Sequence, residues 1–110
     1  MKVYVDSSVI LDIVFRNEAQ IFPRSISKGE RFTSRLTQVE VMRSAIKRDQ
    51  RFAVRAAEIL ATFSFLEMNE QILNRASFYP QEITLKSSDA IHMATAELLL
   101  ESDDLLLTYD

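Results

Sequence analysis

The first fourteen residues, MKVYVDSSVILDIV, limit the fold of this chain more than any other stretch. Val3, Tyr4 and Val5 form a short β-branched and aromatic run, which predicts a buried strand. Asp6 ends this run, and the apolar residues after the two serines recur at helical spacing. A carboxylate is therefore expected where a strand gives way to a helix. Ligands of parallel α/β sheets bind at that end of the strands.

The composition predicts one globular domain. The chain has 110 residues, of which 47% are apolar, so a single core over residues 1–110 is expected. The lack of Cys excludes a disulfide framework and a thiolate metal site, and it favours the reducing cytoplasm. No stretch resembles a signal peptide or is long enough to cross a bilayer, so no membrane partner is expected.

The net charge of −3 bears on nucleic-acid binding. A protein that binds nucleic acid through its own charge is usually basic. If this chain acts on nucleic acid, positive charge has to be supplied locally, and bound divalent cations are able to supply it.

Strand and helix signals alternate along the rest of the chain. Short β-branched or apolar runs predict three further strands, at residues 31–35, 63–66 and 105–107. Helical spacing predicts helices at residues 21–27, from 36 onward, after 49, at 70–79 and at 87–101. Asp49 and either Ser87 or Ser88 are expected to cap two of them. This alternation predicts an α/β fold with a central parallel sheet and helices on both faces.

The helix that begins near residue 36 has an apolar stripe predicted to face the core. The stripe consists of Leu36, Val39, Met42 and Ile46. Glu40 lies at its edge, so this carboxylate is expected at the boundary of the core and not on the solvent face.

The helix at 87–101 is apolar almost all round, which predicts deep burial, as does the Leu105–Leu107 run. Asp89 shares one face with Met93, Ala96 and Leu100. A carboxylate at the head of a buried face is costly unless something compensates it.

Four carboxylates are placed at comparable positions in these units. Asp6 and Asp110 follow strands, whereas Asp89 and Glu40 are expected in the first turns of helices. Because the carboxyl ends of parallel strands share one edge of a sheet, the four side chains are expected to meet there.

Four stretches then resemble a known family: VYVDSSVILDI, TSRLTQVEVMR, SSDAIHMATAELL and LLLTYD. In order and spacing they are similar to PIN-domain nucleases, and above all to the small toxins of prokaryotic VapBC toxin–antitoxin pairs. The third stretch is the most specific of the four. The resemblance implies a three-layer α/β/α fold, RNA cleavage, homodimers and silencing by a cognate VapB-like antitoxin.

The resemblance also implies the site. The family's acidic quartet corresponds to Asp6, Glu40, Asp89 and Asp110, which in the family bind Mg²⁺ or Mn²⁺. We expect Asp6 and Asp89 to be the main ligands and Glu40 to hold or activate a metal-bound water. Asp110 would complete the site or coordinate a second ion. Such hard cations prefer oxygen ligands and are commonly held by one or two carboxylates together with substrate phosphate.

The C-terminus departs from the family pattern. Family members continue past the TYD-like stretch with a further helix and a final edge strand, whereas this chain ends at Asp110. We therefore expect a truncated PIN-like domain of about four strands that lacks those two elements. The fourth carboxylate would lie on a terminal residue that is free to fray.

Each acidic residue also has an ordinary structural interpretation. Asp6 is a good cap for the first helix, and Asp89 complements a helix dipole. Glu40 has Arg43 within ion-pair spacing, and Asp110 is a solvated chain end. These interpretations leave unexplained why four carboxylates follow corresponding ends of βα units.

Other polar residues receive narrower predictions. Ser8 and Thr108 are expected to hydrogen-bond the site carboxylates or the substrate phosphate. His92 is expected at a helix flank or the edge of the core. Four arginines are expected on solvated helix faces: Arg43, Arg48, Arg51 and Arg55.

Three functions compete. The first is a metal-dependent endoribonuclease toxin, and the second is a non-catalytic PIN-like module that engages an antitoxin or self-associates. The third, a receiver-type phosphoacceptor domain, requires an acidic pair after the first strand and a late lysine. Here Asp6 stands alone and the last lysine is Lys86, before the final helix. The RNA target cannot be inferred, because carboxylates and their cations contact phosphate, which carries no sequence information.

Overall fold

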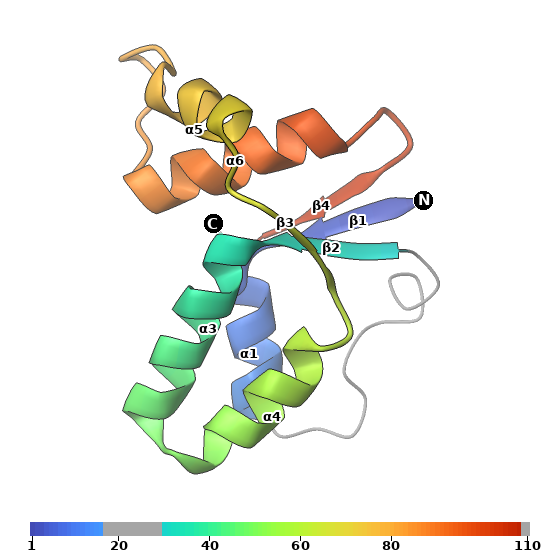
Figure 1. The fold of residues 1–110 in the computed structure, drawn as a ribbon, viewed down its shortest axis with the longest axis vertical. Coiled ribbons are helices and arrows are strands. Elements are labelled where there is room, and N and C mark those ends of the chain that lie inside the picture. The colour runs from blue at the N-terminus through green and yellow to red at the C-terminus, as the bar shows by residue number, and fades with distance from the viewer. Residues whose placement is uncertain (17–29, 109–110) are drawn as a thin grey trace.

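The computed structural model describes residues 1–16 and 30–108; the helix expected at 21–27 and the expected site residue Asp110 lie outside these ranges. Within these ranges the elements follow one another in this order (Figure 1): β1 (Lys2–Val5), α1 (Ser7–Arg16), β2 (Glu30–Ser34), α3 (Arg35–Arg48), α4 (Arg51–Leu60), β3 (Ser64–Leu66), α5 (Glu70–Ser77), α6 (Ser87–Leu99) and β4 (Leu105–Leu107). The predicted strands are confirmed within one residue at their boundaries.

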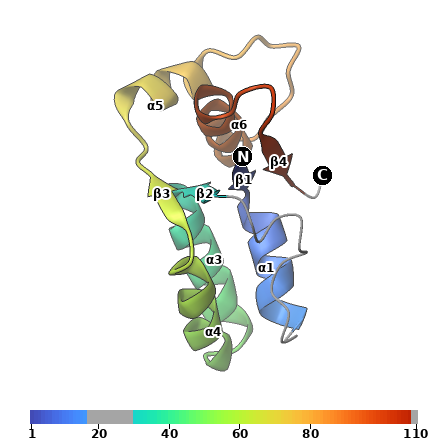
Figure 2. The same cartoon turned by 90° about the vertical axis from the view of Figure 1, so that its right-hand side faces the viewer.

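The strands form one parallel sheet in the order β3-β2-β1-β4. In the centre, Tyr4 pairs with Phe32 of β2 on one side and with Leu106 of β4 on the other. Helices α1, α3 and α4 cover one face of the sheet, and α5 and α6 cover the other (Figure 2). The three-layer α/β/α architecture is therefore confirmed.

Alternation along β1 divides its side chains between the two layers. Val3 and Val5 belong to the main apolar cluster, together with residues of α1, α3 and α4. Tyr4 points to the opposite face, where its hydroxyl meets His92 of α6. Val3, Tyr4 and Val5 are completely buried, which fixes this part of β1 and the position of the residue that follows it.

The stripe predicted for α3 is confirmed only in part: Met42 packs against the core and Leu36 is half-buried, but Val39 and Ile46 are exposed. The buried residues of α3 are Thr37, Val41 and Ala45, whereas Val39 is 58% and Ile46 46% exposed. Thr37, Val41 and Ala45, at a spacing of four, face α1 and α4 where these helices pack, and this leaves Val39 and Ile46 outside.

Hydrogen bonds from the end of β2 also hold the start of α3 in place. The hydroxyl of Thr33 lies 2.7 Å from the hydroxyl of Thr37 and donates to the carbonyl of Val5 at 2.7 Å. The Ser34 side chain caps the helix by accepting from the N–H of Leu36 at 3.1 Å. Glu40 is still half-buried, as predicted.

Two predictions of deep burial are wrong. Leu105 is 36% and Leu106 46% exposed, because β4 is an edge strand whose described neighbour is β1 alone. On α6, Met93 and Leu98 are more than a third exposed, because the helix packs on the sheet and α5 with only part of its surface.

The residues at the starts of α4 and α6 differ in part from the predicted helix caps. The N-cap position of α4 is Gln50 and not Asp49, and the Gln50 side chain makes no cap bond. Asp49, one residue earlier, accepts from the backbone N–H of Arg51 at 2.9 Å, so it supports the start of the helix from just outside it. The cap of α6 is Lys86 and not a serine. Its carbonyl accepts from the N–H of Ala90 at 2.9 Å, and its side chain makes no cap bond.

One of the four arginines does not lie on a solvated face. Arg55 is half-buried, and its guanidinium donates to the carbonyls of Val14 and Ile13, both at 3.0 Å. It thereby caps the C-terminal end of α1 from the neighbouring helix. None of the helices in the described ranges has the length and apolar content that a bilayer crossing needs.

Candidate active site

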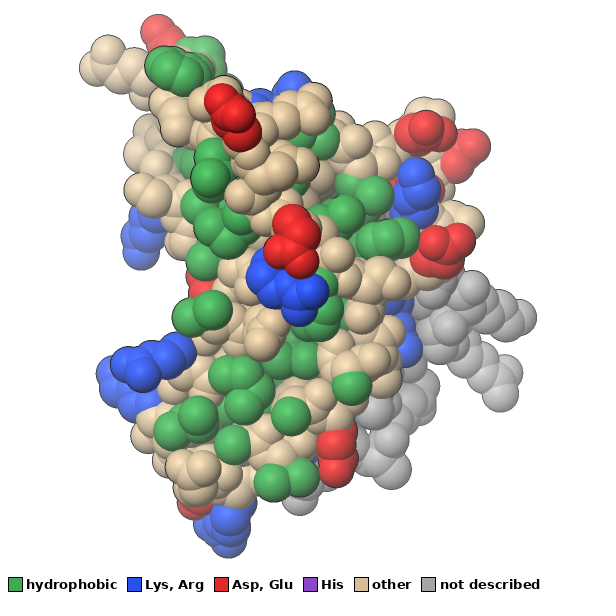
Figure 3. Space-filling view, in the orientation of Figure 1, with side chains coloured by type: hydrophobic (Ala, Val, Ile, Leu, Met, Phe, Trp, Pro, Cys, Tyr) green, Lys and Arg blue, Asp and Glu red, His purple; other side chains and the backbone are tan. Residues whose placement is uncertain are grey.

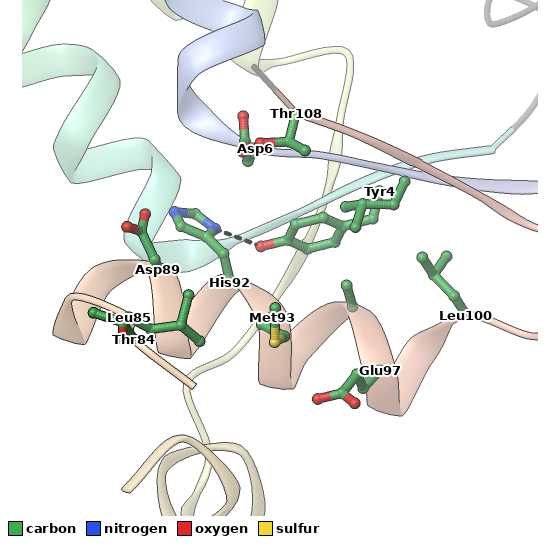
Figure 4. Close-up of a pocket in the computed structure, with 12 residues that line it drawn as sticks. Tyr4, Asp6, Thr84, Leu85, Asp89, His92, Met93, Glu97, Leu100 and Thr108 are labelled. Atoms are coloured by element: carbon green, nitrogen blue, oxygen red, sulfur yellow. Dashed lines mark hydrogen bonds between the residues drawn. The ribbon is translucent and has the colours of Figure 1, made fainter. Parts of the chain in front are cut away.

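A pocket of about 550 Å³ opens where β1 and β4 end and α6 begins. Its walls include the carboxylates of Asp6 and Asp89 and the ring of His92. Figure 4 shows these three side chains at one end of the pocket, with Leu100 and Glu97 further along α6. The polar end therefore lies at the carboxyl edge of the sheet, where the site was predicted.

Asp6 lies between β1 and α1. Its Oδ1 accepts from the Ser8 hydroxyl at 2.6 Å and from the Ser8 N–H at 3.1 Å. Its Oδ2 accepts from the hydroxyl of Thr108, the residue after β4. The capping interpretation is therefore confirmed, and so are the predicted contacts of Ser8 and Thr108. These bonds hold the carboxylate in one orientation at the wall of the pocket.

Asp89 lies in the first turn of α6, as predicted. The side chain is exposed, so the expected cost of burying its charge does not arise. Among residues 1–16 and 30–108, no hydrogen-bond or ion-pair partner occupies its carboxylate. The positive end of the α6 dipole favours negative charge here.

Glu40 lies in the second turn of α3 and not in the first. Its Oε1 is 2.7 Å from Nε2 of His92 on α6, so Glu40 pairs across the sheet edge and not with Arg43. The side chains of Glu40 and His92 are 27% and 10% exposed. Glu40 does not itself line the pocket, but the histidine to which it is bonded does.

Tyr4 and His92 are the two site residues that the sequence analysis missed. The Tyr4 hydroxyl lies 2.7 Å from Nδ1 of His92, and both residues line the pocket. Burial raises the pKa of the Tyr4 phenol far above its ordinary value, and the nearby carboxylates of Asp6 and Glu40 add to the effect. One signal was available, because His92 follows Asp89 by three residues and so lies one turn further along the same helix.

The residues present fit a hard divalent cation. In the described part of the chain no group of three acidic or histidine side chains lies close enough together to enclose a metal ion. Mg²⁺ does not need such a group, because one or two carboxylates with water and substrate phosphate are its usual ligands. Asp6 and Asp89 supply two carboxylates to one pocket.

Known proteins are similar to this chain in both sequence and fold. A sequence model of the PIN domain family matches residues 3–110. Ribonuclease VapC46 of Mycobacterium tuberculosis is 32% identical over 111 residues, which cover 98% of this chain and 84% of that protein. A toxin–antitoxin complex from Klebsiella pneumoniae contains a chain with a TM-score of 0.72 and 26% identity, covering 98% of this chain and 86% of that one.

A further solved structure shows the likeness at the level of fold alone. It is VapBC2 from Rickettsia felis, bound to a DNA fragment from their promoter. Its TM-score is 0.76 at 9% identity, and the match covers 100% of this chain and 89% of that one.

Proposed function

This chain belongs to the PIN domain family, and on that premise we propose that it is the toxin of a type II toxin–antitoxin system, a cytoplasmic endoribonuclease dependent on Mg²⁺ or Mn²⁺. The observation that carries the proposal is the shared pocket of Asp6 and Asp89. These residues are 83 positions apart (89 − 6), yet both carboxylates line one cavity at the sheet edge where the family's chemistry is expected.

Asp6 and Asp89 would hold the cation, with Asp6 kept in place by Ser8 and Thr108. A divalent cation bound there neutralises negative charge on the scissile phosphate and lowers the pKa of the attacking water. Glu40 would orient that water from the α3 side. We assign Asp110 to the same site as a further ligand, on the family resemblance.

The test is cleavage of a structured RNA by the purified chain. Wild type is expected to cleave in Mg²⁺ or Mn²⁺ and to stop in EDTA, because the phosphate then lacks its cation. Asp89→Asn is expected to lose cleavage, since it removes one ligand charge without changing the size of the side chain. Asp103→Asn, an exposed carboxylate near β4, is the matched control and is expected to cleave like wild type.

Cleavage that persists in EDTA, or in Asp89→Asn, would contradict the metal site. Intact RNA with wild type in both metals would instead favour the alternative function, a non-catalytic PIN-like module. Under that alternative the chain would still bind an antitoxin or itself.

We also propose two protein partners. A VapB-like antitoxin is supported by the Klebsiella pneumoniae complex, which contains a similar chain.

A second copy of the chain is supported by Val39 and Ile46, which lie a whole number of turns apart on α3 and are both about half exposed. Figure 3 shows apolar side chains on the surface over the α3 and α4 region. Exposed apolar patches of this kind mark protein interfaces.

A further inference from the structure

His92 is the central residue of a buried hydrogen-bond chain that joins three elements. Its Nδ1 lies 2.7 Å from the hydroxyl of Tyr4 on β1, and its Nε2 lies 2.7 Å from Oε1 of Glu40 on α3. The rings of Tyr4 and His92 also meet edge to face, with their centroids 6.1 Å apart. A residue of α6 thus contacts the central strand and a helix of the opposite layer.

The direction of each hydrogen bond follows from the chemistry of its two ends. The carboxylate of Glu40 can only accept, so Nε2 of His92 donates. When Nε2 carries the proton of the neutral ring, Nδ1 is an acceptor, so the Tyr4 hydroxyl 2.7 Å away donates to it. The chain therefore runs from Tyr4 through the Nε2–H tautomer of His92 to Glu40.

We propose that His92 is a positioning residue for Glu40: its Nε2–H fixes the carboxylate beside the pocket of Asp6 and Asp89, and Tyr4 fixes the ring of His92. The inference rests on the proposed nuclease function, because the orientation of Glu40 matters for activity only if Glu40 orients the attacking water. Glutamate has three side-chain torsions, and a half-exposed carboxylate with no fixed partner would sample many orientations. The short bond to a nearly buried ring removes this freedom.

The location of the bond separates this role from simple core packing. His92 lines the pocket together with Asp6 and Asp89, so the bond to Glu40 is made at the wall of the candidate active site. Partners that orient groups acting with a metal ion typically change activity or metal affinity by about 10–100-fold when they are removed.

The first test reads the tautomer directly. His92 is the only histidine in the chain, so ¹⁵N-histidine labelling of untagged protein reports on this ring alone. The expected NMR signature at pH 7 is a protonated Nε2 whose shift changes in Glu40→Gln. An unprotonated Nε2, or a Nε2 signal that is the same in Glu40→Gln, would overturn the inference. This result does not depend on whether the chain cleaves RNA.

The second test compares two amide substitutions in the RNA cleavage assay. In His92→Gln the amide nitrogen takes a place near that of Nε2 and is able to donate to Glu40, whereas in His92→Asn the shorter amide reaches only the place of Nδ1. We expect kcat to fall about 10–100-fold in His92→Asn and much less in His92→Gln, with KM for RNA unchanged in both. Equal losses of kcat in the two variants, or losses that follow their thermal stability, would overturn the positioning role.

The two proposals fail in different ways. If wild type does not cleave RNA in either metal, the proposed function fails while the NMR signature still decides whether His92 holds Glu40. If wild type cleaves RNA and both His92 variants match it, only the positioning role fails.

Discussion

The carboxylate of Asp6 accepts two hydrogen bonds from Ser8, one from the hydroxyl at 2.6 Å and one from the backbone N–H at 3.1 Å. One side chain thus caps α1 and also faces the pocket. Substitutions that keep the cap but remove the charge separate these two roles, because the cap needs an oxygen acceptor and a cation needs a negative one.

Asp6→Asn is expected to leave the free energy of unfolding within about 0.5 kcal/mol of wild type, because Asn is as good an N-cap as Asp. Asp6→Ala removes the acceptor and is expected to cost about 1 kcal/mol. Denaturant unfolding in EDTA measures both values without a contribution from metal binding. Equal losses in the two variants would show that the charge of Asp6, and not its capping oxygen, supports the fold.

The affinity for Mn²⁺ is expected to fall by more than about tenfold in both Asp6→Asn and Asp89→Asn, since each removes one of the few ligand charges. Isothermal titration calorimetry of the purified chain measures this affinity. Asp12→Asn is the control, because that carboxylate pairs with Arg16 on α1, 2.9 Å away. Wild-type affinity in either site variant would exclude that residue as a ligand.

Arg55→Ala is expected to lower the free energy of unfolding by about 2 kcal/mol, because two carbonyls at the end of α1 lose a charged donor. Arg43→Ala is the matched control, since Arg43 is an exposed arginine on the neighbouring helix α3. Urea unfolding of the two variants makes the comparison. A loss in Arg43→Ala as large as in Arg55→Ala would show that removing any helix arginine lowers stability, and that the α1 cap is not responsible; helix propensity alone would favour Ala in both variants.

The carboxylate of Asp49, just before α4, predicts a pH dependence of stability. Hydrogen bonds from the side chain and backbone of Arg51 lower the pKa of Asp49 from 3.8 to about 2. A carboxylate whose pKa is lower in the folded state stabilises the fold above its unfolded pKa. Wild type is therefore expected to be slightly more stable than Asp49→Asn at pH 6. The difference in stability between the two proteins should narrow as the pH falls from 3.8 towards 2. Denaturation midpoints of both proteins between pH 6 and pH 3 measure this difference. A constant difference over that range would contradict the shift.

The proposed homodimer predicts that wild type elutes at twice the chain mass in size-exclusion chromatography with light scattering. Val39→Asp and Ile46→Asp are expected to shift the protein to monomers, because each buries a charge in the interface. Leu73→Asp places the same charge on α5, in the opposite layer, and serves as the control. Monomeric wild type, or dimers that survive both α3 substitutions, would contradict the proposed surface.

The sequence predicted the sheet and two of the site residues because their signals are local. The β-branched run before Asp6 defines a strand, and the break after it places the carboxylate at the strand end. Asp89 was found in the same way, from the start of a long apolar helix. The pairing of these residues in one pocket then follows from the geometry of parallel βα units.

The sequence could not predict the packing of α3 or the role of His92, because both depend on distant contacts. The stripe on α3 was inferred from the helical spacing of its apolar residues, whereas the face packed against neighbouring helices includes the small Thr37 and Ala45. His92 has partners 88 and 52 residues away in the sequence. Nothing in the local pattern around His92 indicates Tyr4 or Glu40.

The edge position of β4 has a further consequence for how this molecule behaves in concentrated solution. Within the described residues, the outer side of β4 presents backbone N–H and C=O groups to no neighbouring strand. Such an edge is a template for strand addition, and the exposed Leu105 and Leu106 make it prone to aggregation. The exposed Asp103, two residues before the strand, acts against this as a charged gatekeeper, whereas Asp104 accepts from the backbone N–H groups of Lys2 and Glu101. Strand-to-strand association of the described part of the chain is therefore expected to increase when the charge of Asp103 is removed.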